Sequence, residues 1–144
     1  MKRLTTAFIV ILFAVFLFGC AEKVTSENPF EEKYNDLCVE NGKPLIRYYS
    51  TTWCPHCKYI NPIIDSVMLD YKDKVVYRHY ELDINAPTGD DLDEFKNVSP
   101  NGSIPAFSFG CIYYRIGNSF EDIRNTNAEI AEFERVLDEL IDRS

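Results

Sequence analysis

Two cysteines, Cys54 and Cys57, stand three residues apart in the segment Trp53-Cys54-Pro55-His56-Cys57. Cysteines at this spacing in the first turn of a helix can close a small disulfide. Cys54 would lie at the helix N-terminus, where unpaired N–H groups and the helix dipole favour a thiolate. His56 adds positive charge or a donor, and Cys57 should be more buried. The asymmetry predicts that Cys54 attacks disulfides and that Cys57 resolves the mixed disulfide.

The sequence gives less support to other roles of Cys54 and Cys57. The remaining ligand types, Cys38, Cys111 and His79, are not closely spaced, and a structural zinc site needs four converging ligands. A purely structural Cys54–Cys57 bond would close a loop too small to restrain the unfolded chain. Two rivals stay open: a module that handles copper or zinc, and a non-catalytic interaction domain. A metal titration with and without reductant would separate the first, and activity that survives loss of both thiols would favour the second. We expect no cofactor and no resident metal.

Hydrophobic periodicity indicates the elements that position this motif. The predicted order is a helix over 30–40, a strand over 45–49, a helix over 55–71 kinked at Pro62, a strand over 75–84, a short helix around Leu92 and Phe95, hairpin strands over 106–109 and 112–116, and a last helix with an apolar stripe from Ile130 to Ile141. A strand–helix–strand unit predicts a right-handed parallel crossover, and the hairpin adds antiparallel strands. The sequence therefore predicts one α/β domain, a mixed sheet with helices on both faces.

The motif with its flanks, Trp53-Cys54-Pro55-His56-Cys57-Lys58 followed by Pro62, resembles the thioredoxin superfamily. Ser103-Ile104-Pro105-Ala106 resembles the cis-proline loop of that family, and the resemblance extends over residues 30–144. It implies the thioredoxin fold and thiol–disulfide exchange with protein substrates. It also implies that Cys54 is the nucleophile, that Cys57 is the resolving thiol and that Pro105 faces their disulfide.

The same resemblance implies a substrate groove beside the motif. A cis-proline at Pro105 leaves the Ile104 backbone free to pair with an extended substrate strand. Trp53, directly before the first cysteine, is expected to contact substrate as well. The catalytic set is therefore Cys54, Cys57, His56 and Pro105, and the substrate-binding set is Trp53, Ile104 and Pro105.

Two departures from thioredoxin concern the direction of electron flow. Tyr48 stands where thioredoxins carry a buried Asp, six residues before the first cysteine, so the usual proton acceptor for the resolving thiol is missing. Glu81 is either an alternative buried acid or a solvated side chain at a strand end. The dipeptide Pro55-His56 is the one found in the disulfide oxidase DsbA, although the chain has no room for the helical insertion of that protein. A stabilised Cys54 thiolate makes the oxidised form a better oxidant, which favours oxidase or isomerase work. A reductase whose cysteine pair is re-reduced by a membrane redox partner would contain the same residues.

The N-terminus has the pattern of a secretory signal. Lys2 and Arg3 precede an apolar run over 7–18, which is too short to span a bilayer as a helix. The run ends in Leu17-Phe18-Gly19-Cys20, which resembles the lipobox of bacterial-type lipoproteins, and this implies lipidation of Cys20. The alternatives are an ordinary cleaved signal and an uncleaved anchor. We expect a signal peptide over 1–19, a lipidated tether over 20–29 and an extracytoplasmic domain over 30–144 anchored to the membrane.

The charge of the chain excludes some partners. It has 15 Lys and Arg against 23 Asp and Glu, a net charge of −8. Without Lys2 and Arg3 the body carries 13 basic and 23 acidic side chains, a net charge of −10. Such a body repels phosphate backbones, so nucleic acid is not an expected partner. A polybasic mode of membrane binding is also disfavoured.

Two cysteines remain, Cys38 and Cys111. In a compartment that oxidises thiols, an even remainder invites pairing. In the thioredoxin arrangement the strands beside them are neighbours, and both residues fall at the end of the sheet far from the motif. A bond between them would close a loop of 73 residues, which the loop-entropy model values at about 4 kcal/mol. We expect a structural bond that is hard to reduce; the alternative is two buried free thiols.

Overall fold

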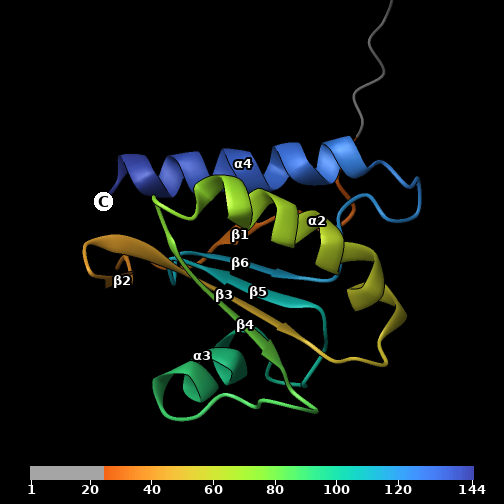
Figure 1. Cartoon of the computed structure of the whole chain (residues 1–144), viewed down its shortest axis with the longest axis horizontal. Helices are drawn as coiled ribbons and strands as arrows, with labels where there is room; N and C mark the ends of the chain where they lie inside the picture. The colour runs from red at the N-terminus through yellow and green to blue at the C-terminus, as the bar shows by residue number, and fades with distance from the viewer. Residues whose placement is uncertain (1–24) are drawn as a thin grey trace, which may run out of the picture.

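The computed structural model describes residues 25–144 of the 144-residue chain, and Figure 1 shows their arrangement. Within this range the structure has six strands and three helices: β1 (Glu31–Glu32), β2 (Val39–Glu40), β3 (Lys43–Ser50), α2 (Pro55–Tyr71), β4 (Val76–Glu81), α3 (Asp90–Val98), β5 (Ala106–Phe109), β6 (Tyr113–Ile116) and α4 (Thr126–Asp142). None of these helices is long and apolar enough to cross a membrane.

β3 lies at the centre of the sheet and is buried along almost its whole length. It pairs in parallel with β4 on one side and antiparallel with β5 on the other. The hairpin of β5 and β6 continues the sheet, β1 adds to β6, and β2 folds back onto the start of β3. The sheet is therefore mixed, as the order of elements predicted.

Helices cover both faces of the sheet (Figure 1). α2 and α4 lie together on one face, and α3 lies on the other, against β5 and β6. The core between the sheet and the helix pair is aromatic and aliphatic, and includes Ile46, Ile60, Phe107, Phe133 and Leu137. The apolar stripe predicted for the last helix supplies this core. The helix of residues 55–71 continues unbroken through Pro62.

The predicted helix over 30–40 is wrong. This segment contains β1 and β2 joined by bends, because its backbone groups pair with distant strands. Glu31 pairs with Tyr114, and the N–H of Lys33 donates to the carbonyl of Ile112 at 3.0 Å. Phe30 is held in the core by Phe109, with ring centroids 4.8 Å apart. Tertiary pairing has overridden a helical spacing of apolar residues.

Asn41 and Gly42 do not end a helix; they turn the chain between β2 and β3. Both have positive φ, 53° and 74°, which is the left-handed conformation that tight hairpin turns require. Asn-Gly is the preferred sequence for such a turn. The sequence signal at this point was therefore a hairpin signal.

The folded part also begins earlier than the predicted boundary at Phe30. The N–H of Glu27 donates to the carbonyl of Ser119 at 3.1 Å, and the Asn28 amide donates to the carbonyl of Asn118 at 3.0 Å. Residues 27–29 are thus bound to the domain and do not belong to a free tether. Residues 1–24, with the predicted signal peptide and Cys20, lie outside the described residues.

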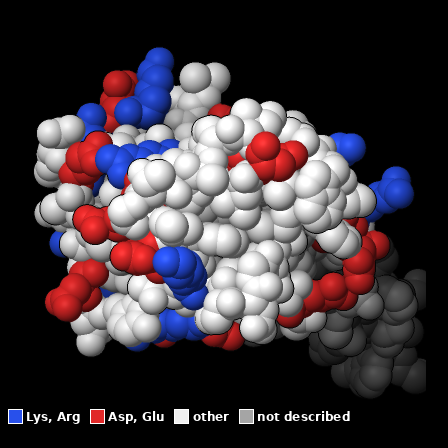
Figure 2. All heavy atoms as spheres, turned by 90° about the horizontal axis from the view of Figure 1, so that it is seen from below, with Lys and Arg blue, Asp and Glu red and all other residues white. Residues whose placement is uncertain are grey.

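On the face seen in Figure 2, Lys and Arg side chains lie among Asp and Glu side chains. This is the side of the sheet that α3 covers in Figure 1. Charged side chains of both signs lie mainly toward the edges of this face, and most of its middle is uncharged.

Candidate active site

Cys54 caps the N-terminus of α2. β3 ends at Ser50, a short turn follows, and the helix begins at Pro55, which suits a first helical position because it has no N–H to satisfy. Cys54 has extended backbone angles, and its Sγ accepts a hydrogen bond from the N–H of Cys57 at 3.3 Å. The Sγ atom therefore lies against the positive end of the helix, where a thiolate is stabilised.

Cys57 lies one turn into the helix and is fully buried. Burial, with the neighbouring Cys54 as a second cause, raises the pKa of the Cys57 thiol to about 12. Cys57 therefore stays protonated at neutral pH. Both thiols are free in the structure. Cys54 is buried as well, with 4% exposure against 0% for Cys57, so the two thiols differ in their place on the helix and in the raised pKa of Cys57. Their roles in exchange stay predictions.

Three polar side chains, Tyr48, Ser50 and His79, cluster on β3 and β4, and the Tyr48 hydroxyl lies near the Cys57 thiol. Tyr48 is fully buried; its hydroxyl donates to Oδ1 of Asn61 at 2.6 Å and its ring stacks on His79 with centroids 4.4 Å apart. Ser50 Oγ lies 2.7 Å from Nε2 of His79. Burial raises the pKa of Tyr48 well above its usual range and lowers the pKa of His79. The position where a thioredoxin would carry an acid therefore holds a neutral tyrosine, with Ser50 and His79 beside it.

Glu81, the alternative acid, ends β4 opposite Ser50 in the parallel register and is half-buried. Its backbone N–H donates to Oδ1 of Asn85 at 2.7 Å. Glu81 thus lies at the end of β4 next to Ser50. Its part in proton transfer stays a prediction.

The sequence did not indicate which residues hold His56. Its Nδ1 lies 2.8 Å from Oε2 of Glu121. The amide of Asn118 donates both to that carboxylate oxygen, at 2.8 Å, and to the His56 carbonyl, at 3.0 Å. These partners lie 62 and 65 residues downstream in the loop between β6 and α4. No spacing rule links residues at that separation, so only the fold reveals them.

A buried charge cluster fixes this loop. Arg115 on β6 is fully buried and pairs with Glu129 at 3.2 Å and Glu132 at 3.0 Å, both on α4. Its guanidinium lies against three aromatic rings, those of Phe30, Phe107 and Phe133. Glu129 also accepts from the N–H of Phe120 at 2.7 Å. Arg115 therefore joins the end of the sheet, the last helix and the loop that reaches His56.

The predicted substrate groove has its parts at the same end of the sheet. The Ile104–Pro105 peptide bond is cis, and Pro105 is buried directly before β5. β5 begins with Ala106 opposite Tyr49, so Pro105 lies beside the end of β3, from which the cysteine motif emerges. Ile104 is half-buried, and Trp53 is 67% exposed next to Cys54. The substrate-binding roles of these residues stay predictions.

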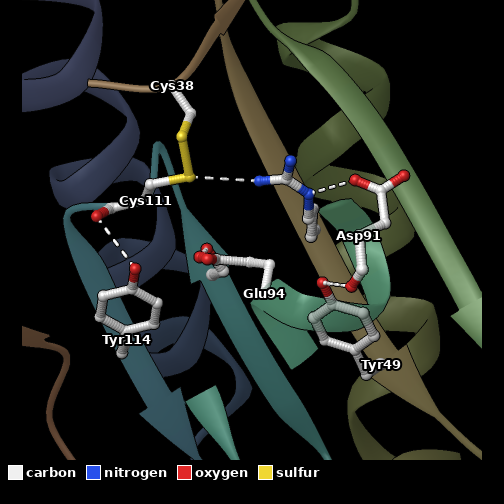
Figure 3. Close-up of a disulfide and its surroundings, with 8 residues drawn as sticks. Cys38, Tyr49, Asp91, Glu94, Cys111 and Tyr114 are labelled. Atoms are coloured by element: carbon white, nitrogen blue, oxygen red, sulfur yellow. Dashed lines mark hydrogen bonds and ion pairs between the residues drawn. A yellow bond between two sulfur atoms is a disulfide. The ribbon is translucent and has the colours of Figure 1, made fainter. Parts of the chain in front are cut away.

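Cys38 and Cys111 form a disulfide at the opposite end of β3, with an S–S distance of 2.05 Å and Cα atoms 5.4 Å apart (Figure 3). The two free thiols of the alternative interpretation are therefore absent from the described structure. No group of three or more His, Cys, Asp or Glu side chains that could hold a metal ion is found in residues 25–144.

The fold and the site define a class of protein: an α/β domain that presents a pair of thiols at the start of a helix. Residues 21–100 match the family model described as Thioredoxin. The chain belongs to the thioredoxin family.

Individual relatives are distant. The chain is 28% identical over 115 residues to the thioredoxin-like protein HCF164, chloroplastic, of Arabidopsis thaliana, which covers 75% of this chain and 40% of that protein. It is 27% identical over 111 residues to the thioredoxin Asp f 29 of Aspergillus fumigatus, covering 77% and 88%. The crystal structure of mitochondrial thioredoxin 3 from Saccharomyces cerevisiae aligns with a TM-score of 0.42 at 18% identity, covering 66% and 76%.

Proposed function

We propose that this protein is a membrane-tethered, extracytoplasmic thiol–disulfide oxidoreductase that acts on protein substrates through Cys54 and Cys57. The proposal rests on the different positions of the two thiols at the start of α2. Cys54 caps α2 with its sulfur toward the helix N-terminus, and Cys57 is buried one turn further on with a raised pKa. An attacking thiol needs thiolate character, and a resolving thiol needs to stay protonated until the mixed disulfide has formed.

The reaction needs no group beyond the two thiols and the substrate. In the reductive direction, the Cys54 thiolate attacks one sulfur of a substrate disulfide, and the other substrate sulfur leaves as a thiolate. Cys57 then loses its proton and attacks Cys54 Sγ, which releases the second substrate thiolate and leaves a Cys54–Cys57 disulfide. Two electrons pass to the substrate. The oxidative direction is the same sequence reversed.

We further propose that the oxidised form delivers disulfides, as an oxidase or isomerase does. Pro55-His56 between the cysteines supports this direction, and so does the neutral side chain of Tyr48 near Cys57, where thioredoxins carry an acid. His56 is 65% exposed and bound to Glu121, so it lies at the surface where substrate arrives. A membrane redox partner would return the site to its working state.

The tether and the compartment rest on the sequence. Lys2 and Arg3, the apolar run over 7–18 and Leu17-Phe18-Gly19-Cys20 support export and lipidation of Cys20. The Cys38–Cys111 disulfide agrees with a compartment in which thiols oxidise. The proposed substrates are thiol and disulfide proteins of that compartment.

Two measurements test the proposal. The first is turnover of a protein disulfide or of a reduced protein by the wild-type chain, with Cys54→Ser and Cys57→Ser as comparisons. Loss of turnover in Cys54→Ser is expected, and full activity in that variant would refute the assigned chemistry. The second is the reduction potential of Cys54/Cys57 in a glutathione buffer. A value above roughly −200 mV supports the oxidase or isomerase direction, and a value near −270 mV, as in thioredoxin, contradicts it.

A further inference from the structure

One sulfur of the Cys38–Cys111 disulfide contacts a cationic side chain. Nη1 of Arg47 lies 3.2 Å from Sγ of Cys111, and its Nε lies 2.6 Å from Oδ1 of Asp91, so the guanidinium joins that sulfur to a carboxylate. Arg47 is 5% exposed, so this charge is held out of water. Nothing in the chemistry proposed for Cys54 and Cys57 uses it, because this disulfide lies at the other end of β3.

Arg47 shares its carboxylate partner, Asp91, with other donors. Its Nε pairs with Oδ1 of Asp91 at 2.6 Å, but Asp91 also binds Nη1 of Arg78 at 2.7 Å and accepts from the Tyr80 hydroxyl. Glu94, on the same helix as Asp91, accepts from the hydroxyl of Ser108, and Glu40 pairs with Arg78. The Arg47 nitrogen that faces Cys111 therefore meets a neutral sulfur. A thiolate at Cys111 would give this nitrogen an anionic partner.

The two cysteines differ in their contact with a surface hollow. This hollow of about 440 Å³ lies beside the disulfide, and Cys38, Arg47, Arg78 and Asp91 are among its lining residues. Cys38 and Cys111 are both half-buried, but Cys111 is not among the lining residues of the hollow. The hollow therefore gives an incoming thiolate a route to Cys38. Attack on Cys38 makes Cys111 the leaving sulfur, and that is the sulfur next to Arg47.

We propose that Cys38–Cys111 is a second thiol–disulfide exchange site, in which a dithiol reductant attacks Cys38 and Cys111 leaves as a thiolate paired with Arg47. A leaving thiolate that is stabilised departs faster, and a nearby cation stabilises a thiolate. The first step breaks the Cys38–Cys111 bond and forms a mixed disulfide between the reductant and Cys38. The second thiolate of the reductant attacks its own sulfur in that bond and releases Cys38. The reductant becomes a disulfide. The two protons and two electrons that it gives up reduce Cys38 and Cys111 to thiols.

Reduction at this site would change how the segment before β3 is held. The disulfide links that segment covalently to the turn between β5 and β6. Without it, the backbone bonds at Cys38 remain: its N–H donates to the Gly110 carbonyl at 2.8 Å, and its carbonyl accepts from the N–H of Leu45 at 2.9 Å. Loop entropy resists loss of this bond at equilibrium, whereas Arg47 acts on the rate at which it exchanges. The site is thus suited to control local opening of residues 30–42.

The test follows reduction of the native full-length chain carrying Cys54→Ser and Cys57→Ser, so that Cys38–Cys111 is the disulfide observed. Dithiothreitol is the probe, and samples are alkylated and mapped by mass spectrometry to count thiols at Cys38 and Cys111. We expect a rate that rises with dithiothreitol concentration. Arg47→Met should slow it about tenfold or more, and Arg47→Lys should retain part of the rate. Arg78→Met, which lines the same hollow without touching sulfur, is the matched control and should change it little.

A second measurement does not depend on whether the Arg47 variants fold. Glutathione, a monothiol, is added to the same Cys54→Ser, Cys57→Ser chain, and the reaction is stopped with acid. The mixed disulfide is expected on Cys38. A mixed disulfide on Cys111, equal rates in folded Arg47→Met and its parent, or a rate set by global unfolding would each overturn the proposal. Because these chains lack the Cys54/Cys57 pair, the result is independent of the proposed oxidoreductase function.

Discussion

Nδ1 of His56 lies 2.8 Å from Oε2 of Glu121, so the residue between Cys54 and Cys57 is held by a loop 65 residues further along the chain. Asn118 reinforces the contact by donating to the His56 carbonyl. The position of the His56 imidazole is therefore a property of the tertiary structure, although the motif that contains it is local.

Replacing Glu121 with Gln should free the His56 ring and lower the rate of exchange by about tenfold or less, because a positioning contact to a partly exposed ring is modest in energy. The readout specific to this role is the nitrogen NMR spectrum of His56, which should show a change in the tautomer at Nδ1. Asp122→Asn alters the same charge on the neighbouring, exposed residue of the loop and should leave the spectrum unchanged. An unaltered His56 spectrum in Glu121→Gln would contradict the assignment.

Cys57→Ser should accumulate mixed disulfides with substrate proteins, because Cys54 can attack but nothing remains to release the product. Non-reducing gels of the membrane fraction, followed by mass mapping, would identify the bond at Cys54. The double variant Cys54→Ser, Cys57→Ser is the control and should trap nothing. Adducts that persist in the double variant would show that another thiol is responsible.

The reduced protein should lose stability as the solution becomes alkaline, partly because of Cys57. Its folded-state pKa is raised from 9.0 to about 12, mainly by burial, so the folded state favours the protonated thiol. This contribution is fully present below pH 9 and is lost as the pH rises from 9 toward 12. Denaturant unfolding of the reduced chain at several pH values would measure it. Cys57→Ser should show a shallower decline over the same window, and equal slopes would contradict the buried-thiol interpretation.

Arg115→Met should destabilise the fold by about 3–5 kcal/mol, because it leaves the buried carboxylate of Glu129 without its cation. The matched control is Arg135→Met on α4, where the exposed pair with Glu139 at 3.5 Å should cost about 0–1 kcal/mol. Denaturant unfolding of oxidised protein gives both values. A loss in Arg115→Met no larger than in Arg135→Met would show that the cluster does not hold β6 to α4.

Mature protein from cells is expected to begin at Cys20 and to carry lipid there. Lipid favours membrane anchoring, and two acyl chains make it stable. Mass spectrometry of the N-terminal peptide, with fractionation of cells, tests this. Cys20→Ala should move the protein out of the membrane fraction. An N-terminus at another residue, or quantitative release of wild-type protein, would remove the anchor from the proposal.

Much of this protein could be predicted from local sequence. Cys54, Pro55, His56 and Cys57 form a motif whose chemistry depends on helix position, and the helix over 55–71 was evident from its apolar period. The hairpin of β5 and β6 and the apolar stripe of α4 were likewise visible, because each buries one face of a regular element. The sequence also contained the even pair of cysteines, and topology from the family resemblance placed Cys38 near Cys111.

The tertiary structure decided the rest. Residues 30–40 have helical spacing but form strand and bend, because distant strands offer their backbone partners and the core takes Phe30. The contacts of Glu121 with His56 and of Arg47 with Cys111 each join residues more than 60 positions apart. Burial gives the Arg47 contact its weight, since a charge removed from water must find a partner wherever the chain brings one. Periodicity and spacing describe neighbours along the chain, and these partners are neighbours only after the sheet has formed.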